Sequence, residues 1–287
     1  MPQTINTNLV SLNAQRNLSS SQSSLATSMQ RLSSGLRVNS AKDDAAGLAI
    51  AERMSSQVRG MNVGVRNAND AISMSQTAEG ALGKVGDLFQ RMRELAVQSA
   101  NGTNSAADRA SVNQEFVQLA QEATRTLGGT KFNGQSILAT TNSSTFQIGA
   151  NNSTDIDQIT VTAFNWAANA GLTGVLGSSI ITGTNVPTQQ VTDISTAQAA
   201  IATIDTAIDS VNSQRAAYGA AQNRFENVVS TLMVGVENQS AARSRIMDAD
   251  YATETSNLSR ASILQQAGNA MVAQANQLPQ QVLALLR

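Results

Sequence analysis

The chain has 287 residues, with 19 basic and 20 acidic side chains and a formal net charge of −1. This near-neutral balance gives no electrostatic case for binding nucleic acid or an anionic membrane. The sequence contains no cysteine and no histidine, which excludes disulfides, thiolate metal sites, the HExxH zinc-protease motif and Ser-His-Asp catalysis. Aromatic residues make up only 3% of the chain, which suits thin helix–helix seams better than a compact core. We predict a protein that is not an enzyme and holds no cofactor or metal.

The N-terminal 40 residues carry a narrow apolar stripe with spacings of three and four. It comprises Ile5, Leu9, Leu12, Leu18, Leu25, Met29, Leu32 and Leu36. The other faces are mostly serine, asparagine, glutamine and threonine, so the intrinsic helix propensity is weak. We predict an amphipathic helix that needs a partner to bury its stripe.

A break at Ser34-Gly35 precedes a much longer stripe. From Met54 to Ala96, apolar residues recur at heptad spacing, which is typical of a coiled-coil seam. A helix over residues 44–100 would be on the order of 85 Å long. Asp43 and Asp44 are placed to cap it, and this role is favoured over a divalent-metal site because no further acidic cluster adjoins them.

The centre of the chain differs from both ends. NGTNSAAD, residues 101–108, predicts a turn, after which a second helix ends at Gly128-Gly129 and folds back as a helical hairpin. Within residues 130–185, the segments FNGQSIL, STFQIGANNS and DQITVTAF predict a small β module with NG and NN turns. The segment GLTGVLGSSIITGTNVP, residues 171–187, is predicted to be a loop.

Two more helical stripes complete the sequence. The first runs almost without a break from Ile194 to Val236, and the last begins near Ala261 and ends at Leu285. This nearly palindromic layout predicts that 1–40 pairs with 255–287, and that the long helices pair with one another. The fold class is therefore mainly α: a long antiparallel coiled-coil rod with a small β module, no large outer domains, and hinges near 34–43 and 238–250.

The sequence pattern predicts neither a membrane span nor a secretory signal peptide. No run of 18 apolar residues appears, and the first residues lack a basic region followed by an apolar one. By that criterion alone the expected location is the cytoplasm.

Three separated segments resemble bacterial flagellin. They are SSGLRVNSAKDDAAGLAIAERM, QRMRELAVQSANGTN and the C-terminal stretch from Ser240 to Arg287. Many flagellins carry large outer domains between their helical halves, whereas this centre is short, so the resemblance implies a minimal flagellin of the inner and middle layers, D0 and D1. The implied division is 1–43 for the N-terminal D0 helix and hinge, 44–129 for the D1 N-terminal helices, 130–189 for the β/loop module, 190–238 for the D1 C-terminal helix, and 239–287 for the hinge and C-terminal D0 helix.

The resemblance implies a structural subunit that self-assembles into the helical flagellar filament for swimming. It also replaces the cytoplasmic expectation, because flagellins leave through the flagellar type III export apparatus without a cleaved signal peptide and are extracellular. The implied partners are other copies of the chain, an export chaperone on the C-terminal helix, and the filament cap and hook-junction proteins. The alternative is a hook-associated junction protein, which should have a longer centre and no intact QRMRELAVQ; an enzyme embedded in the centre is more distant.

The terminal stripes can form either an intramolecular hairpin or a surface buried between subunits, and their low charge favours the second interpretation. The predicted polymerisation seam is Ile5, Leu9, Leu12, Leu18, Leu25, Met29, Leu32, Leu264, Met271, Leu278, Val282 and Leu285. Periodicity alone favours a solvated ion pair between Arg91 and Glu94. The resemblance instead implies recognition by Toll-like receptor 5 through Gln90, Arg91, Leu95, Gln98 and Glu115.

Overall fold

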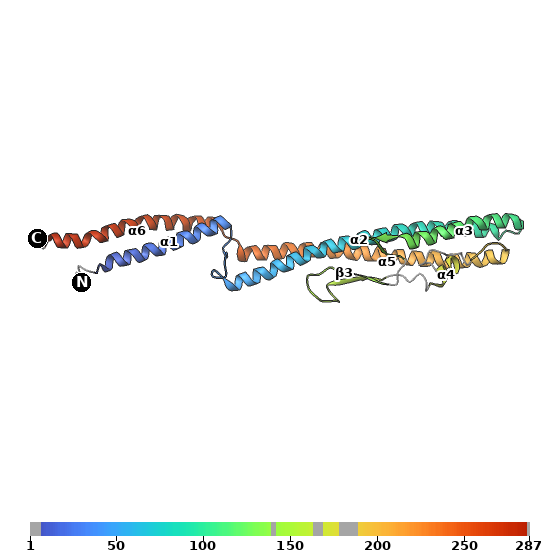
Figure 1. Ribbon diagram of the computed structural model, residues 1–287, viewed down its shortest axis with the longest axis horizontal. Coiled ribbons are helices and arrows are strands. Elements are labelled where there is room, and N and C mark those ends of the chain that lie inside the picture. Colours follow the sequence, from blue (N-terminus) through green and yellow to red (C-terminus); the bar gives the residue numbers. More distant parts are fainter. Residues whose placement is uncertain (1–6, 139–141, 163–168, 178–188, 286–287) are drawn as a thin grey trace. The chain divides into compact units, whose positions relative to one another are not determined.

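The computed structural model describes residues 7–138, 142–162, 169–177 and 189–285, without the side chains of 170 and 278–285. The described chain is mainly helical with two small antiparallel sheets, which confirms the predicted fold class in these respects (Figure 1). It separates into two compact units, Met1–Ser56 with Glu237–Arg287 and Gln57–Val236. No described helix is long and apolar enough to cross a membrane.

In the first unit, helix α1 (Leu9–Ser34) lies beside helix α6 (Tyr251–Leu285), as Figure 1 shows. Asn8 caps α1 by accepting a hydrogen bond from the Ser11 amide, and its own side-chain amide donates to the Ala275 carbonyl at 2.7 Å. The Ser11 hydroxyl adds a 2.8 Å hydrogen bond to Asn276. The predicted pairing of residues 1–40 with residues 255–287 is therefore confirmed for the described parts of both helices, and it occurs within one molecule.

Two short linkers connect these terminal helices to the long helices. Gly35, with φ +71°, ends α1 in the left-handed region, where a side chain would be strained. Beyond it the chain runs antiparallel to the end of α5 (Ile194–Met247): Leu36 pairs with Asp248, and the Arg37 amide donates to the Met247 carbonyl at 2.7 Å. Val38 and Met247 are buried beside these bonds.

The extent predicted for the second hinge is wrong. The sequence pattern places it over residues 238–250, but α5 stays helical to Met247, so the break covers only residues 248–250. Residues 238–247 contain no glycine or proline, and Arg245 lies in the last turn, where a cation favours the helix terminus.

In the second unit, parts of α2 (Ala45–Ser99) and α5 pack with α3 (Ala106–Gly129) around one core. Its largest members are Phe89, Phe116 and Phe225, all fully buried. Many other core positions are alanine, which lets long helices approach closely along a narrow seam. The heptad pattern thus predicted the buried face of these helices correctly.

The β module consists of two hairpins. Strands β1 (Lys131–Phe132) and β2 (Gln135–Ser136) flank a turn in which Asn133 has φ +49° and Gly134 has φ +79°, as the NG signal predicts. Strand β3 (Ser144–Gln147) pairs antiparallel with β4 (Gln158–Val161).

The loop predicted for residues 171–187 is partly wrong, because α4 (Ala170–Leu176) is helical. Asn169 caps it by accepting hydrogen bonds from two backbone amides, and Leu172, Val175 and Leu176 are buried in the core. Burial of these apolar side chains outweighs the low helix propensity of the glycines in this segment. The rest of the predicted loop, to Pro187, lies outside the described residues.

The β3–β4 hairpin rests on α2 at two glycines. A Cβ at Gly64 would lie 2.1 Å from the Ile148 carbonyl oxygen, and one at Gly60 would lie 2.6 Å from the Ala150 Cβ. On the other side, the Phe146 ring meets the Phe225 ring edge-on at 5.7 Å. The hairpin is therefore seated on the helices by close backbone contact as well as by aromatic packing.

Candidate assembly and recognition surfaces

The contact between α1 and α6 is made by small side chains. Ser11 and Ser28 of α1, and Ala261 and Ala275 of α6, are the buried residues of this kind. Gly268 also lies in this contact, where an added Cβ would approach the Leu18 side chain at 3.2 Å. Because serine and alanine side chains have little apolar area, these buried positions contribute little hydrophobic stabilisation to the seam.

Large apolar side chains of the same two helices face outward. Leu9, Leu12, Met29, Leu264 and Met271 are 69, 48, 55, 51 and 59% exposed. Leu18, Leu25 and Leu32 are half-buried. Ile5 and the side chains of Leu278, Val282 and Leu285 lie outside the described residues. The intramolecular pair thus leaves much of the predicted seam uncovered.

Sequence reasoning missed other exposed apolar residues on these helices. Val10, Tyr251 and Ile263 are 55, 55 and 66% exposed. Val10 and Ile263 adjoin the predicted seam residues Leu9 and Leu264 in sequence, and Tyr251 is the first residue of α6, but all three fall outside a strict stripe with spacings of three and four. Patches of this kind on a monomer mark interaction sites.

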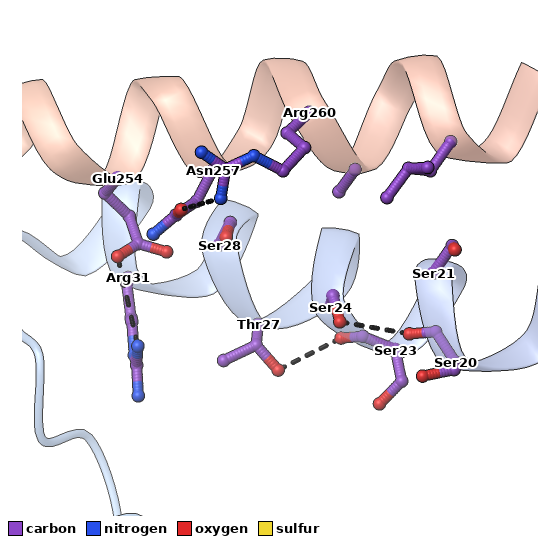
Figure 2. A pocket seen from close by; sticks show the side chains of 12 residues that line it. Ser20, Ser21, Ser23, Ser24, Thr27, Ser28, Arg31, Glu254, Asn257 and Arg260 are labelled. Atoms are coloured by element: carbon purple, nitrogen blue, oxygen red, sulfur yellow. Dashed lines mark hydrogen bonds and ion pairs between the residues drawn. The ribbon is translucent and has the colours of Figure 1, made fainter. Parts of the chain in front are cut away.

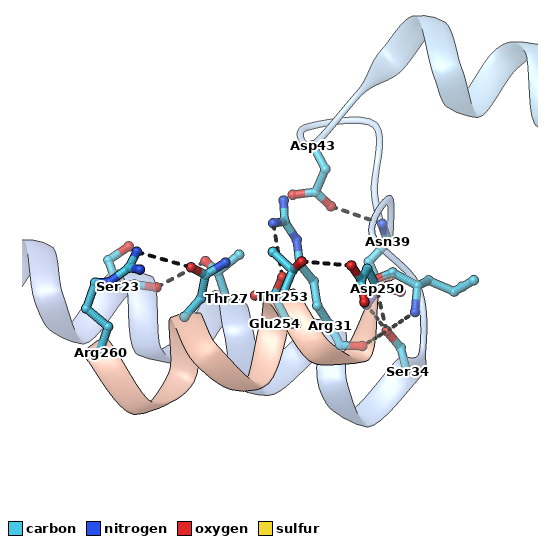
Figure 3. Close-up of polar contacts among 12 residues, drawn as sticks. Ser23, Thr27, Arg31, Ser34, Asn39, Asp43, Asp250, Thr253, Glu254 and Arg260 are labelled. Atoms are coloured by element: carbon cyan, nitrogen blue, oxygen red, sulfur yellow. Dashed lines mark hydrogen bonds and ion pairs between the residues drawn. The ribbon is translucent and has the colours of Figure 1, made fainter. Parts of the chain in front are cut away.

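A charged cluster lies where α1 and α6 meet the linkers (Figure 3). The Arg31 guanidinium is 3.9 Å from the buried Glu254 carboxylate, and it lies beside Asp43 in Figure 3. The pKa of Asp43 is lowered, mainly by hydrogen bonds from the Ser40 amide and hydroxyl and the Asn39 amide, with a further contribution from the Arg31 charge.

Of the acidic pair before α2, Asp44 has the predicted capping role. Asp44 accepts a 2.8 Å hydrogen bond from the Gly47 amide, as an N-cap residue does. Asp43 instead closes the turn that precedes it. In the described part of the chain, no group of three acidic residues is arranged to hold a metal ion.

A second charged cluster bridges α2 and α3. Arg91 donates to the Glu115 carboxylate through Nε and Nη2, at 3.0 and 2.9 Å, and to Glu94 through Nη1 at 2.9 Å. Both carboxylates raise the pKa of Arg91, with the Glu94 hydrogen bond the larger cause. The structure thus brings Arg91 and Glu115 together on an exposed face, and the ion pair with Glu94 favoured by periodicity is present as well.

The remaining receptor residues divide between surface and core. Gln90 and Gln98 are exposed near Arg91, whereas Leu95 is 1% exposed and belongs to the hydrophobic core. Leu95 does not share the exposed face with Arg91 that their spacing of four suggests, because it belongs with Met92 and Ala96 to the core-facing stripe of α2, and Arg91 lies outside that stripe.

Comparison with known proteins gives the family. The model of the bacterial flagellin N-terminal helical region matches residues 5–143, and that of the C-terminal helical region matches residues 201–286. A flagellin of Halalkalibacterium halodurans is 45% identical over 284 residues, 99% of each chain. A Serratia marcescens flagellin is 41% identical over 351 aligned positions that cover both chains fully. The crystal structure of Bacillus cereus flagellin aligns with 58% of this chain and 88% of its own, at 34% identity and a TM-score of 0.49. The two matched helical regions and the relatives aligned along their whole length show that the chain belongs to the bacterial flagellins, the structural subunits of the flagellar filament.

Proposed function

We propose that this chain polymerises through the uncovered apolar face of its paired terminal helices. The observation that carries the proposal is an inversion within the pair. Small residues such as Ser28 and Ala261 are the most deeply buried between α1 and α6, whereas the large apolar side chains of Leu9, Leu12, Met29, Leu264 and Met271 face outward. A helix pair that stays exposed to water would bury its leucine and methionine side chains and expose its serines. Burying one such leucine between copies is worth about 1.5–3 kcal/mol.

This role is structural and not catalytic. Low charge fits it as well, since a solvated surface helix normally carries more lysine and glutamate than α1, whose charged residues are Arg16 and Arg31. Copies that meet along these faces would complete each other's hydrophobic contacts, so assembly and ordering of the ends are coupled.

The test compares two exposed apolar residues. Leu264→Asn in the proposed seam should raise the monomer concentration in equilibrium with filament by about tenfold or more. The matched control is Ile156→Asn, which changes a residue that is 79% exposed in the β3–β4 loop and should leave that concentration unchanged. Sedimentation of polymer and electron microscopy supply the measurement. Equal effects of the two substitutions, or none from Leu264→Asn, would refute the proposed seam.

A second proposal concerns the charged cluster on α2 and α3. We propose that Gln90, Arg91, Gln98 and Glu115 form a surface recognised by Toll-like receptor 5, with Leu95 supporting it from the core. The position of Arg91 supports this, since its guanidinium is held by two carboxylates while its side chain is 50% exposed. Arginine held in one geometry is well suited to anchor a protein interface.

The chain offers a close control for this proposal. Arg93 is 46% exposed and pairs with Asp205 at 2.6 Å, so it matches Arg91 in charge and exposure on another face of α2. Arg91→Ala should weaken activation of the receptor by purified monomer, whereas Arg93→Ala should not. In the family this surface also lies against neighbouring subunits, so intact filament should activate the receptor weakly. Full activation by Arg91→Ala monomer would contradict the proposal.

The remaining proposals concern the export route and further partners of the chain, and they rest on its membership of the flagellin family. We propose that the chain leaves the cell through the flagellar export apparatus without a cleaved signal peptide. An export chaperone would cover the C-terminal helix until then, and the filament would contact cap and hook-junction proteins. The exposed apolar residues of α6 support the chaperone contact, because an uncovered face of this kind favours premature association. A pull-down with residues 251–287 deleted should lose the chaperone.

A further inference from the structure

A polar cavity lies between α1 and α6. Its volume is about 480 Å³, and Figure 2 shows two of its walls, with serine and threonine hydroxyls of α1 on one side and Asn257 and Arg260 of α6 on the other. Leu264 of α6 also lines it. Arg31 and Glu254 close one end. All of these residues belong to the same compact unit.

Several hydroxyls in this wall already have partners. The side chains of Ser21, Ser24 and Thr27 donate to carbonyls one turn earlier in α1. Ser28 differs from them, because its side chain points toward α6 in Figure 2, is only 5% exposed, and has no hydrogen-bond partner among the described residues. Because a serine hydroxyl can both donate and accept, Ser28 offers a donor to a ligand in the cavity.

The two arginines of the cavity also have unused donors. Arg31 Nε is buried and has no hydrogen-bond partner in the described part of the chain, although its guanidinium is 3.9 Å from Glu254. Arg260 makes one long contact, 3.4 Å from Nη1 to Asn257 of its own helix. With Glu254 offsetting one arginine, the cavity carries a net positive charge and a set of unused donors, which together suit an oxyanion.

Charge and shape favour a carboxylate that belongs to another copy of the chain. The two terminal helices contain three arginines and one glutamate, a net charge of +2, whereas the rest of the chain carries 16 basic and 19 acidic side chains, a net charge of −3. The cavity is much larger than an inorganic ion, and Leu264, 51% exposed at its rim, continues into the proposed assembly face. An aspartate or glutamate can place its stem against Leu264 and its carboxylate beside Arg260.

We infer that this cavity receives an acidic side chain of a second copy of the chain when copies pack together, with Ser28, Arg31 and Arg260 as the donors. The inference rests on the proposed polymerisation and adds a polar contact of defined chemistry to it. Such a contact fixes the register of neighbouring copies, because charged groups in an apolar interface penalise misaligned packing.

The chain is well suited to a direct test, because its lysines are only Lys42, Lys84 and Lys131 and lie outside the cavity. Arg260→Lys keeps the charge and supplies an amine. Chains with this substitution, labelled with ¹⁵N, are incorporated into filaments of excess unlabelled wild-type protein and treated with a carbodiimide. This reagent joins the amine to a carboxylate in contact with it as an amide, and itself takes up the elements of water.

Mass spectrometry then identifies the partner. The expected product joins a labelled peptide containing position 260 to an unlabelled peptide through an aspartate or glutamate. Links only to Glu254 of the same labelled chain, or no link at position 260, would overturn the inference. Electron microscopy before the reaction establishes that filaments are present, so failure of the proposed polymerisation is distinguished from failure of this contact.

Charge reversal gives an independent measurement. Arg260→Glu should raise the monomer concentration in equilibrium with filament by about tenfold or more. Arg16→Glu is the matched control, since it reverses an exposed arginine of α1 outside the cavity. Equal effects of the two reversals would also overturn the inference.

Discussion

The seating of the β3–β4 hairpin on α2 predicts opposite effects for the same substitution at two glycines of one helix. A Cβ added at Gly80 would have no atom within 4 Å, whereas one added at Gly64 would lie 2.1 Å from the Ile148 carbonyl oxygen and 2.9 Å from its carbon. Alanine favours a helix interior over glycine by about 0.8–1 kcal/mol. Gly80→Ala should therefore stabilise the second unit by up to that amount.

At Gly64 the same gain is opposed by the clash. The obstructing atoms are backbone, so relief requires a shift of the whole hairpin and not a change of rotamer. Overpacking of this kind costs about 1–3 kcal/mol, and the net result should be a loss of up to about 2 kcal/mol. With a unit of this size, each kcal/mol changes the unfolding temperature by roughly 2–4 °C.

The assay is urea and thermal unfolding of the monomer, followed by circular dichroism at 222 nm. Wild type, Gly64→Ala and Gly80→Ala are compared at one protein concentration below that of assembly. If Gly64→Ala stabilises the protein as much as Gly80→Ala does, the close contact between α2 and the hairpin does not exist in solution, and the seating described above is refuted.

Three further predictions concern the core, a helix cap and a linker. Phe225→Ala should destabilise the second unit by about 3–5 kcal/mol in urea unfolding, because it removes a fully buried ring and its edge-on contact with Phe146. Ser105→Ala should raise the carboxyl pKa of Asp108 toward its ordinary value in an NMR titration, since the Ser105 hydroxyl and then its amide lower that pKa. Because the pKa of Asp108 is lower in the folded state, its ionised carboxylate stabilises the fold at pH values above the ordinary pKa of 3.8, and this stabilisation is lost as the pH falls through the folded pKa. The Ser105→Ala variant should therefore lose less stability on acidification than the wild type. Gly35→Ala, at φ +71°, should cost about 1–2 kcal/mol in the first unit, measured by hydrogen exchange of α1 amides in the filament.

Periodicity predicted the long helices well because each buries one regular stripe. The core members of α2, from Ala68 through Leu82 and Phe89 to Ala96, follow the heptad pattern of the sequence. Local turn chemistry was equally reliable, as the Asn133-Gly134 hairpin and the Asp44 cap show. In these cases a few neighbouring residues determine the structure, so no knowledge of the distant chain is needed.

The sequence-based predictions are wrong where contacts with distant residues, or the lack of a helix-breaking glycine or proline, determine the secondary structure. The segment containing Leu172 and Val175 looks like a loop by composition and becomes helical because those side chains reach the core. The break after α5 is predicted too early, because the apolar pattern changes near residue 238 while the helix continues to Met247. The apolar pattern shows which face of a helix is buried, whereas the length of the helix depends on where a glycine or proline interrupts it.

The candidate surfaces likewise contain some features that the sequence predicts and one that it does not. Exposure of Leu9 and Leu264 agrees with a stripe that the single chain leaves uncovered, and this follows from the stripe together with its weakly helical surroundings. The burial of Leu95 could have been read from its place among the core-facing residues of α2. The cavity lined by Ser28 and Arg260 could not be predicted from the sequence, because it depends on how two segments more than 200 residues apart pack side by side.

In the proposed assembly, the seam between α1 and α6, in which the most deeply buried residues are small, makes the stability of the chain's ends a collective property. Residues that gained their main apolar contacts from other copies would be stabilised by mass action, so the melting point of the terminal helices should rise with subunit concentration. The core around Phe89 and Phe225 is complete within one chain and melts independently of concentration. A single polypeptide thus combines one part whose folding is set by its sequence and another whose folding is set by how many neighbours it has.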